Sequence, residues 1–141
     1  MKVFLDTNIL LDVLLEPDGP VDESAAVITR CGRLNAAMFV SWHGLATCSY
    51  LLKKGRSRDE MLEQLDQIPA WAVVVTCGDA EARQARQLGF NDFEDALQAV
   101  AAGSCGADCI VTRNTGDFKE SAVPAISPAE FLMRYALSPP P

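Results

Sequence analysis

Short apolar runs alternate along the chain with longer stretches in which apolar residues recur every three or four positions. The runs have the length and β-branched content of strands, and the recurring positions are typical of helices with one apolar face. The predicted strands span 2–5, 37–41, 71–76, 109–113 and 122–126. The predicted helices cover about 9–14, 22–32, 45–54, 57–68, 79–89 and 92–103, with a last one starting near 128. This alternation predicts a three-layer α/β/α sandwich around a parallel sheet of four to five strands.

Polar residues and prolines mark the ends of several predicted helices. Ser57 begins an S-R-D-E capping box, Asp92 is placed to cap the helix that follows it, and Pro17 stops the first helix ahead of a loop at 18–20. A chain of 141 residues fits one domain, which we expect to span 1–138. The three prolines at 139–141 are expected to form a disordered tail.

Composition limits the possible functions. The net charge of −7 argues against a protein that holds nucleic acid on a broad basic face. Five cysteines, an odd count without C-x-x-C spacing, favour a reduced cytoplasmic protein. Met1 leads directly into a strand pattern, and no run of 18 apolar residues occurs, so we expect neither export nor a membrane span.

Oxygen-bearing side chains gather where predicted strands end. In an open parallel sheet, ligands bind outside the carboxyl ends of the strands. Asp6 follows the first strand, and the first turn of the helix from 92 places Asp92 and Asp95 on one face, from which Glu94 should point away. Two further polar residues follow the strand at 109–113, namely Asn114 and Asp117.

Such a group of carboxylates is suited to a divalent cation. Neighbouring carboxylates repel one another and raise each other's pKa unless a cation lies among them, and Mg²⁺ or Mn²⁺ takes oxygen ligands. An ion held there can activate water for attack on a phosphodiester. Taken singly, Asp6 is better explained as a helix cap, Asp92 is equally explained as one, and Asn114 and Asp117 are equally explained as turn residues. Their shared edge favours the functional interpretation.

Three segments of the chain resemble the landmark motifs of PIN domains, in particular the VapC-like group. They are F-L-D-T-N-I-L-L-D at 4–12, D-F-E-D-A-L-Q at 92–98 and I-V-T-R-N-T-G-D-F at 110–118. A closing S-P-A-E-F-L at 127–132 extends the agreement over nearly the whole chain. The resemblance implies a metal-dependent ribonuclease, often the toxin of a toxin–antitoxin pair, usually dimeric and neutralised by a small antitoxin protein.

The resemblance also implies roles for individual residues. Asp6 would be the first metal ligand and Asp95 the central one, with Asn114 and Asp117 at the remaining acidic positions. Asp92 would be an accessory carboxylate. Thr112 and Asn8 would orient the ligands or a bound water through hydrogen bonds.

Two positions depart from the family pattern. Thr47 stands where many PIN domains have a glutamate, and Asn114 stands where many have an aspartate. These changes predict weaker or single-metal binding, or a site completed by the substrate phosphate. They also motivate an alternative, a PIN-derived module that binds protein or RNA without catalysis. A phosphoryl-transfer receiver would need a lysine at the end of a late strand, where Arg113 is a poor substitute.

Other side chains have both functional and structural interpretations. Lys53, Lys54 and Arg56, with Arg58 nearby and Arg113 at the proposed site, could guide an RNA backbone, although the cluster at 53–58 is equally expected at a solvated helix end. His43 could act as a base or contact substrate, and Trp42 could stack on a nucleobase. A structural role at the start of a helix is favoured for His43, and packing in the core or at a dimer interface explains Trp42 at least as well.

Overall fold

A computed structural model describes residues 1–15 and 22–137. The predicted loop at 18–20, the stop at Pro17 and the tail at 139–141 lie outside these residues, and the domain boundary at 138 stays a prediction. The strands form one parallel sheet in the order β3-β2-β1-β4-β5. Their bounds are β1 (Lys2–Leu5), β2 (Ala37–Ser41), β3 (Val73–Val75), β4 (Cys109–Val111) and β5 (Ala125–Ile126). The predicted parallel sheet is confirmed.

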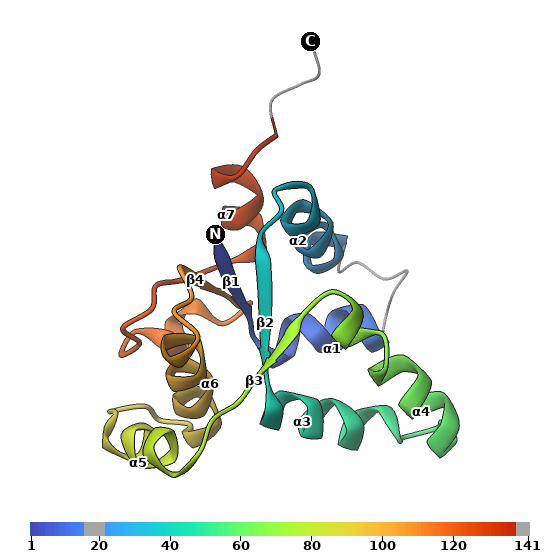
Figure 1. Ribbon diagram of the computed structural model, residues 1–141, viewed down its shortest axis with the longest axis horizontal. Helices are drawn as coiled ribbons and strands as arrows, with labels where there is room; N and C mark the ends of the chain where they lie inside the picture. Colours follow the sequence, from blue (N-terminus) through green and yellow to red (C-terminus); the bar gives the residue numbers. More distant parts are fainter. Residues whose placement is uncertain (16–21, 138–141) are drawn as a thin grey trace.

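Helices cover both sides of this sheet, which confirms the three-layer sandwich (Figure 1). One side carries α1 (Thr7–Leu15), α2 (Asp22–Arg33), α3 (Trp42–Leu52), α4 (Arg58–Leu65) and α7 (Pro128–Arg134). The other side carries α5 (Asp79–Gln87) and α6 (Phe93–Ser104). Two short 3₁₀ helices, η1 (Ile68–Ala70) and η2 (Thr115–Phe118), complete the described elements.

The central strand β1 separates two apolar cores. Val3 and Leu5 point into the larger core beneath α1, α2 and α7, whereas Phe4 points into the smaller core beneath α6. This division follows from the alternation of side chains along a strand. Because β1 is buried on both faces, its carboxyl end is a rigid base for the residues that follow it.

Several predicted boundaries shift for local reasons. α3 begins at Trp42 rather than Leu45, because the Ser41 hydroxyl caps it by accepting a hydrogen bond from Gly44 N at 2.9 Å. β3 is shorter than the predicted 71–76 and lies at the sheet edge, where Val73 is 56% exposed. β4 ends at Val111 rather than at 113, and the Thr112 hydroxyl that follows it donates to the Asp6 side chain after β1.

The C-terminal helix α7 is fastened to α2. Arg30, in the last turn of α2, donates from Nη1 to the carbonyl oxygens of Leu132 at 3.1 Å and Tyr135 at 2.5 Å. Phe131 of α7 is fully buried in the larger core. Helix α7 is therefore a structural part of the sandwich.

All five cysteines are free thiols, and Cys31, Cys48 and Cys109 are buried. Burial raises the pKa of Cys31 to about 12, and it raises that of Cys109 to about 11. Over the two described ranges, no helix combines the length and the apolar character needed to cross a bilayer.

Candidate active site

Asp6 lies immediately after β1 and is only 5% exposed. One carboxylate oxygen, Oδ1, accepts from the Thr7 backbone N at 2.7 Å, and the other, Oδ2, accepts from the Thr112 hydroxyl at 2.7 Å. Burial raises the pKa of Asp6, and the hydrogen bonds from Thr112 and Thr7 oppose that rise without cancelling it. The fold therefore holds a carboxylate in one orientation in a place that disfavours its charge.

Thr112 is the centre of a hydrogen-bond network that joins the ends of β1 and β4. Its side chain is fully buried, and its hydroxyl accepts from Asn8 Nδ2 at 3.2 Å and from the Asn114 backbone N at 3.0 Å. Asn8 Oδ1 in turn accepts from the backbone N of Arg113 at 3.3 Å. Of the two residues expected to orient the ligands, Thr112 contacts Asp6 directly and Asn8 contacts it through Thr112.

Helix α6 brings further carboxylates to the same place. Asp92 caps this helix, and its Oδ1 accepts from the Glu94 backbone N at 2.8 Å. Partial burial raises the pKa of Asp95 to about 6, and the negative charges of four neighbouring carboxylates add to that rise. Those neighbours are Asp6, Asp92, Asp117 and Glu94. We call these five carboxylates the acidic edge.

The expectation that Glu94 points away from the other carboxylates is wrong. The Thr7 hydroxyl donates to Glu94 Oε1 at 3.5 Å, and burial followed by the charge of Asp6 raises the pKa of Glu94. The Glu94 charge also contributes, after burial, to raising the pKa of Cys48 on α3 to about 12. The first turn of α6 lies directly over the end of β1, so adjacent positions of that turn both reach it. Helical periodicity alone could not show this.

Thr7 connects the acidic edge to the packing between helices. Its hydroxyl oxygen accepts a hydrogen bond from Nε2 of Gln98, a buried residue of α6. A side-chain carbon added at Gly44 of α3 would lie 2.7 Å from Ser41 Oγ and 2.9 Å from Thr7 Oγ1. Gln98 and Gly44 were not singled out from the sequence, although a glutamine on the otherwise apolar face of α6 is a signal of a buried polar contact.

The segment after β4 contributes the remaining predicted residues. Asp117 lies exposed in η2, and its charge adds to the raised pKa values of Asp95 and Asp6. The Asn114 carbonyl accepts from the Asp117 backbone N at 3.0 Å. In the described residues, no hydrogen bond joins the Asn114 side chain to the acidic edge, so the structure places this residue nearby through its backbone only.

Arg113 is held by a buried carboxylate. Its Nε lies 3.0 Å from Oδ2 of Asp12 on α1, and the same oxygen accepts from the Ser24 hydroxyl at 2.7 Å. The positive charge of Arg113 also lowers the pKa of Asp6, partly opposing burial. Arg113 therefore stands beside the acidic edge in a fixed position.

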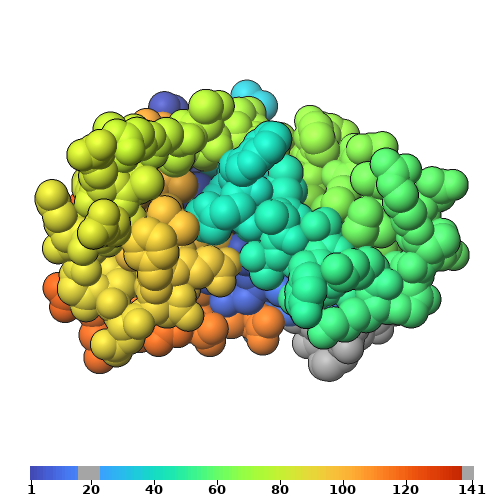
Figure 2. Space-filling model, turned by 90° about the horizontal axis from the view of Figure 1, so that it is seen from below, coloured from blue at the N-terminus to red at the C-terminus, as the bar shows by residue number. Residues whose placement is uncertain are grey.

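A polar cavity of about 440 Å³ opens on this side of the molecule. Its walls include Asp92, Asp95 and Asp117, with Lys119 among the residues that line it. Figure 2 looks onto the carboxyl ends of the strands, where the blue N-terminal segment is recessed between amber α6 and teal α3. Carboxylates that hold a cation, together with a nearby lysine, suit a substrate whose phosphate group contacts both the cation and the lysine.

Thr47 and the predicted basic residues Lys53, Lys54 and Arg56 lie on or just after α3, and none of them lines the polar cavity. The Thr47 hydroxyl donates to the carbonyl of His43 within its own helix, at 3.3 Å. The Lys53 and Lys54 ammonium groups lie 4.6 and 5.4 Å from the centre of the Tyr50 ring. Arg56 follows them. All three basic residues are at the far end of α3, roughly 16 Å along the helix axis from Trp42.

The chemistry of the donors fits a hard divalent cation. Carboxylate and amide oxygens predominate, and the pKa values of Asp95 and Glu94 are raised by burial and then by neighbouring carboxylates, so a cation among them would stabilise their charged forms. Across residues 1–15 and 22–137, no group of three or more aspartate, glutamate, histidine or cysteine side chains lies close enough to hold a metal ion. Mg²⁺ and Mn²⁺ commonly keep several waters and share few protein ligands with a phosphate.

Replacing Thr112 by valine is expected to weaken Mn²⁺ binding about 10- to 100-fold, because Asp6 loses the hydroxyl that orients it. Calorimetric titration with Mn²⁺ measures the effect. Thr112→Ser keeps the hydroxyl and should bind Mn²⁺ nearly as well as the natural protein. Equal affinity in the valine variant would show that Thr112 has no part in orienting a ligand.

Comparisons with known proteins give one family and several similar structures. A family model described as PIN domain matches residues 2–116. A search of curated proteins found no match. A chain in the crystal structure of VapBC2 from Rickettsia felis, bound to a DNA fragment from its promoter, is 18% identical with a TM-score of 0.71, and the match covers 90% of this chain and 98% of that one.

Two further structures are similar. A chain of VapBC-1 from nontypeable Haemophilus influenzae is 14% identical with a TM-score of 0.67, covering 92% of this chain and 99% of that one. A chain of FitAcB from Neisseria gonorrhoeae is 18% identical with a TM-score of 0.64, covering 90% and 98% respectively. At such identities the likeness shows a shared fold alone.

Proposed function

Because this chain belongs to the PIN-domain family, whose members are generally nucleases that use divalent metal ions, we propose that it is a metal-dependent endoribonuclease that hydrolyses RNA phosphodiester bonds. One observation carries the proposal. At the carboxyl edge of the sheet, four carboxylates from three separate segments surround Asp95, and after burial their charges raise its pKa: Asp6, Asp92, Asp117 and Glu94. That arrangement is unfavourable unless a cation joins it.

We assign the metal-holding role to Asp6, Asp95 and Asp117, with Asn114 contributing through water and Asp92 as an accessory charge. A bound Mg²⁺ or Mn²⁺ would lower the pKa of a water molecule and offset charge on the phosphate oxygens. Asp6 needs no rearrangement for this role, since its two oxygens are already fixed by Thr7 and Thr112.

Glu94 compensates in this proposal for the carboxylate that Thr47 lacks. It reaches the end of β1 from α6, contacts Thr7 and lies near enough to Cys48 of α3 to raise the pKa of that thiol. A glutamate from α3 and one from α6 can thus serve the same region. The lack of a glutamate at Thr47 then removes one possible ligand from α3, and Glu94 on α6 supplies an acidic group to the same region.

Two basic residues are placed to hold the substrate backbone. Lys119 lines the polar cavity together with Asp95 and Asp117. Arg113 uses Nε to bond Asp12, which fixes the guanidinium while its side chain remains about half exposed. Both can bind a phosphate next to the acidic edge despite the overall negative charge of the protein.

Cleavage of an unstructured RNA during a Mn²⁺ titration tests the proposal. The natural protein should cleave only with the ion present, and Asp95→Asn should lower the rate at saturating RNA by at least about tenfold, because it removes a charge that faces Asp6 and Asp117. Glu94→Gln should lower the affinity for Mn²⁺ by a smaller factor. Asp79→Asn, which breaks an exposed ion pair with Arg83 on α5, is the matched control.

Two outcomes would contradict the ribonuclease proposal: equal cleavage by the natural protein and Asp95→Asn, or no cleavage with any divalent ion. If Mn²⁺ binds with useful affinity and RNA stays intact, the remaining candidate is a PIN-derived binding module. That second candidate is favoured by the neutral side chain at Thr47, which donates to its own helix.

We also propose that the protein is the toxin of a toxin–antitoxin pair and acts as a homodimer neutralised by a small protein partner. The support is that the matched chains come from VapBC and FitAcB structures of similar length. A short open reading frame immediately upstream that encodes a small DNA-binding protein would support the pairing. Light scattering of the purified protein reports the oligomeric state.

A further inference from the structure

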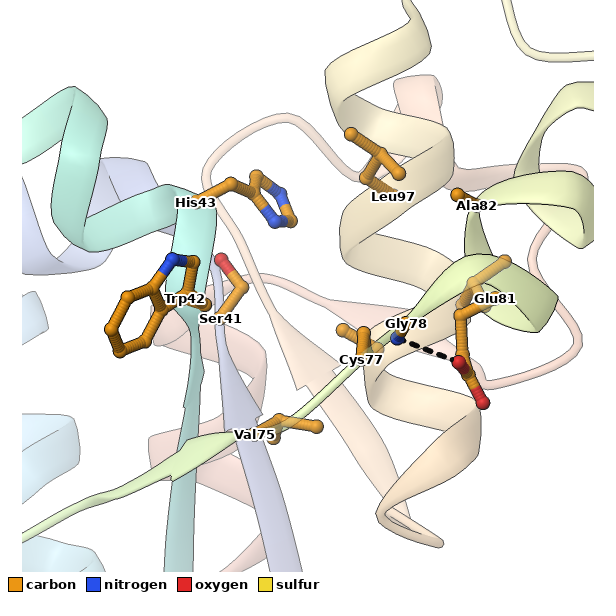
Figure 3. A pocket seen from close by; sticks show the side chains of 11 residues that line it. Ser41, Trp42, His43, Val75, Cys77, Gly78, Glu81, Ala82 and Leu97 are labelled. Carbon is orange, nitrogen blue, oxygen red and sulfur yellow. Dashed lines mark hydrogen bonds between the residues drawn. The ribbon is translucent and has the colours of Figure 1, made fainter.

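A second cavity of about 200 Å³ opens at the carboxyl edge of the sheet, away from the acidic edge (Figure 3). We call it the edge cavity. It lies between the beginning of α3, the segment after β3 and the middle of α6. The residues that define it are Trp42, His43, Val75, Cys77, Leu97 and Val100. Seen from the carboxyl ends of the strands, it lies where teal α3, yellow-green α5 and amber α6 meet (Figure 2).

The walls of the edge cavity are largely apolar and include an exposed aromatic ring. Val75, Leu97 and Val100 supply aliphatic surface, and Trp42 stands at the rim with 74% of its surface exposed. A smaller hollow beside it shares Trp42, Val75 and Cys77, so the apolar surface continues past the indole. An exposed tryptophan next to an apolar recess suits a planar ligand ring, which can stack on the indole with one face and contact the aliphatic side chains with the other.

His43 supplies the one unpaired polar group that points this way. Its ring projects between Trp42 and Leu97, and its Nε2 is buried without a hydrogen-bond partner among the described residues (Figure 3). Burial lowers the pKa of His43, so the imidazole is neutral at physiological pH. A neutral imidazole nitrogen can pair with a ring nitrogen, amino group or carbonyl of a ligand.

The two cavities at this edge differ in charge. Asp92, Asp95, Asp117, Glu120 and Lys119 line the polar cavity, whereas Glu81 is the one charged residue among those that line the edge cavity. A phosphate is therefore favoured only in the polar cavity, and there only together with a cation that offsets the carboxylates. The edge cavity favours an uncharged ring with hydrogen-bonding atoms on its rim.

The two sites are joined by short stretches of chain. Ser41 lines the edge cavity, and its hydroxyl oxygen and that of Thr7, the residue after Asp6, lie 2.7 and 2.9 Å from the same point beside Gly44. This short separation between Ser41 and Thr7 allows a polymer held by its phosphates at the acidic edge to present a neighbouring base to the edge cavity. Among polymers, single-stranded RNA combines exposed planar bases with such a backbone.

We propose that the edge cavity binds one unpaired nucleobase of the RNA substrate, flanking the phosphodiester bond held at the acidic edge. The inference rests on the proposed ribonuclease function. Trp42 stacks on the base, the aliphatic side chains of α6 cover its other face, and His43 Nε2 bonds its edge. The site gives the protein a preference for unstructured RNA over duplex, because a paired base cannot leave its helix without loss of stacking.

Fluorescence of Trp42 provides a test that does not depend on catalysis. The chain has two tryptophans, so Trp71→Phe leaves Trp42 as the single reporter. The probe is a single-stranded 2′-O-methyl RNA of about eight nucleotides, titrated at low salt with Ca²⁺, a hard cation that can occupy the acidic edge. Binding should quench Trp42 emission. In a series of RNAs that each lack one base at a different position, the RNA that lacks the bound base should show less quenching and lower affinity.

Substitution of the aromatic residue supplies the second measurement. Trp42→Ala should weaken binding about 5- to 100-fold, the range expected for loss of one base stacked on an aromatic side chain. Trp42→Phe should retain part of the affinity. Tyr50→Ala is the matched control, because Tyr50 is 57% exposed on the same helix but lies near its other end. Circular dichroism checks that each variant is folded.

The outcomes separate this inference from the ribonuclease proposal. If Trp42→Ala binds and cleaves RNA like the natural protein, or if every abasic RNA binds like its parent, the edge cavity is no base site and belongs to some other ligand, such as a protein side chain. Metal-dependent cleavage would survive that result. In active protein, the expected signature is a higher KM for Trp42→Ala with a kcat changed less than twofold. Absence of RNA binding by the reporter protein would also overturn the inference.

Discussion

Asp6→Asn should lower RNA cleavage at least about 100-fold and abolish the stabilising effect of Mn²⁺, while the metal-free protein melts at the same temperature or higher. The loss of activity follows from removing a charge that the fold holds in one orientation through Thr7 and Thr112. The unchanged stability follows because burial raises the pKa of Asp6, which means that the folded protein disfavours the charged form. An uncharged amide relieves that penalty, and the hydrogen bond from Thr112 that its amino group cannot accept offsets the gain.

Thermal melting in EDTA and in Mn²⁺ measures both effects on the same samples. The natural protein should gain stability as Mn²⁺ rises above its dissociation constant, by about 2.7 kcal/mol at a hundredfold excess over that constant. Asp6→Asn should show no gain. A variant that melts far below the natural protein in EDTA would mean that Asp6 serves folding, and the functional assignment would be wrong.

Gly44→Ala should destabilise the protein by about 1–3 kcal/mol and reduce activity with it. The added carbon would lie within 3 Å of the Ser41 and Thr7 hydroxyl oxygens, at 2.7 and 2.9 Å. Neither hydroxyl can move freely, since Ser41 caps α3 and Thr7 is bonded to Gln98 and Glu94. Relief of the clash must therefore disturb a helix start or the residue next to Asp6.

Urea unfolding reports this change as a lower midpoint with an unchanged slope. Gly103→Ala is the matched control, because Gly103 is also helical and an added carbon there meets no atom within 4 Å. That variant should be neutral or more stable by up to about 1 kcal/mol. Equal midpoints for the two variants would show that α3 yields to the extra carbon without strain.

The alternation of apolar runs with helical patterns was sufficient to predict the sandwich, because strands and helices differ in the spacing of their apolar residues. β1 and β4 are short continuous apolar runs, and both are buried on two faces. The run at 71–76 looks the same in sequence but forms an edge strand with one exposed valine. The order of strands in a sheet depends on helix packing across the whole chain, which no local window contains.

The position of the acidic residues after strands was predictable, whereas their contacts were not. Parallel strands end at one edge, so Asp6 and the residues after Val111 had to lie close together. The approach of Glu94 to Thr7 depends on where the first turn of α6 sits over β1. The network of Gly44, Thr7 and Gln98 depends on three helices at once. The metal-binding roles of Asp6, Asp95, Asp117 and Asn114 stay predictions.

The attachment of α7 bears on how the protein can be shortened. The matched family segment ends at residue 116, before β5 and α7. A fragment cut there would lose the strand that pairs with β4, and it would leave an open slot where the Phe131 ring had filled the interior. The Arg30 guanidinium would have no carbonyl oxygens to bond. Such a fragment would expose apolar surface and self-associate, so an inactive truncation of this kind would say nothing about the chemistry of the acidic edge.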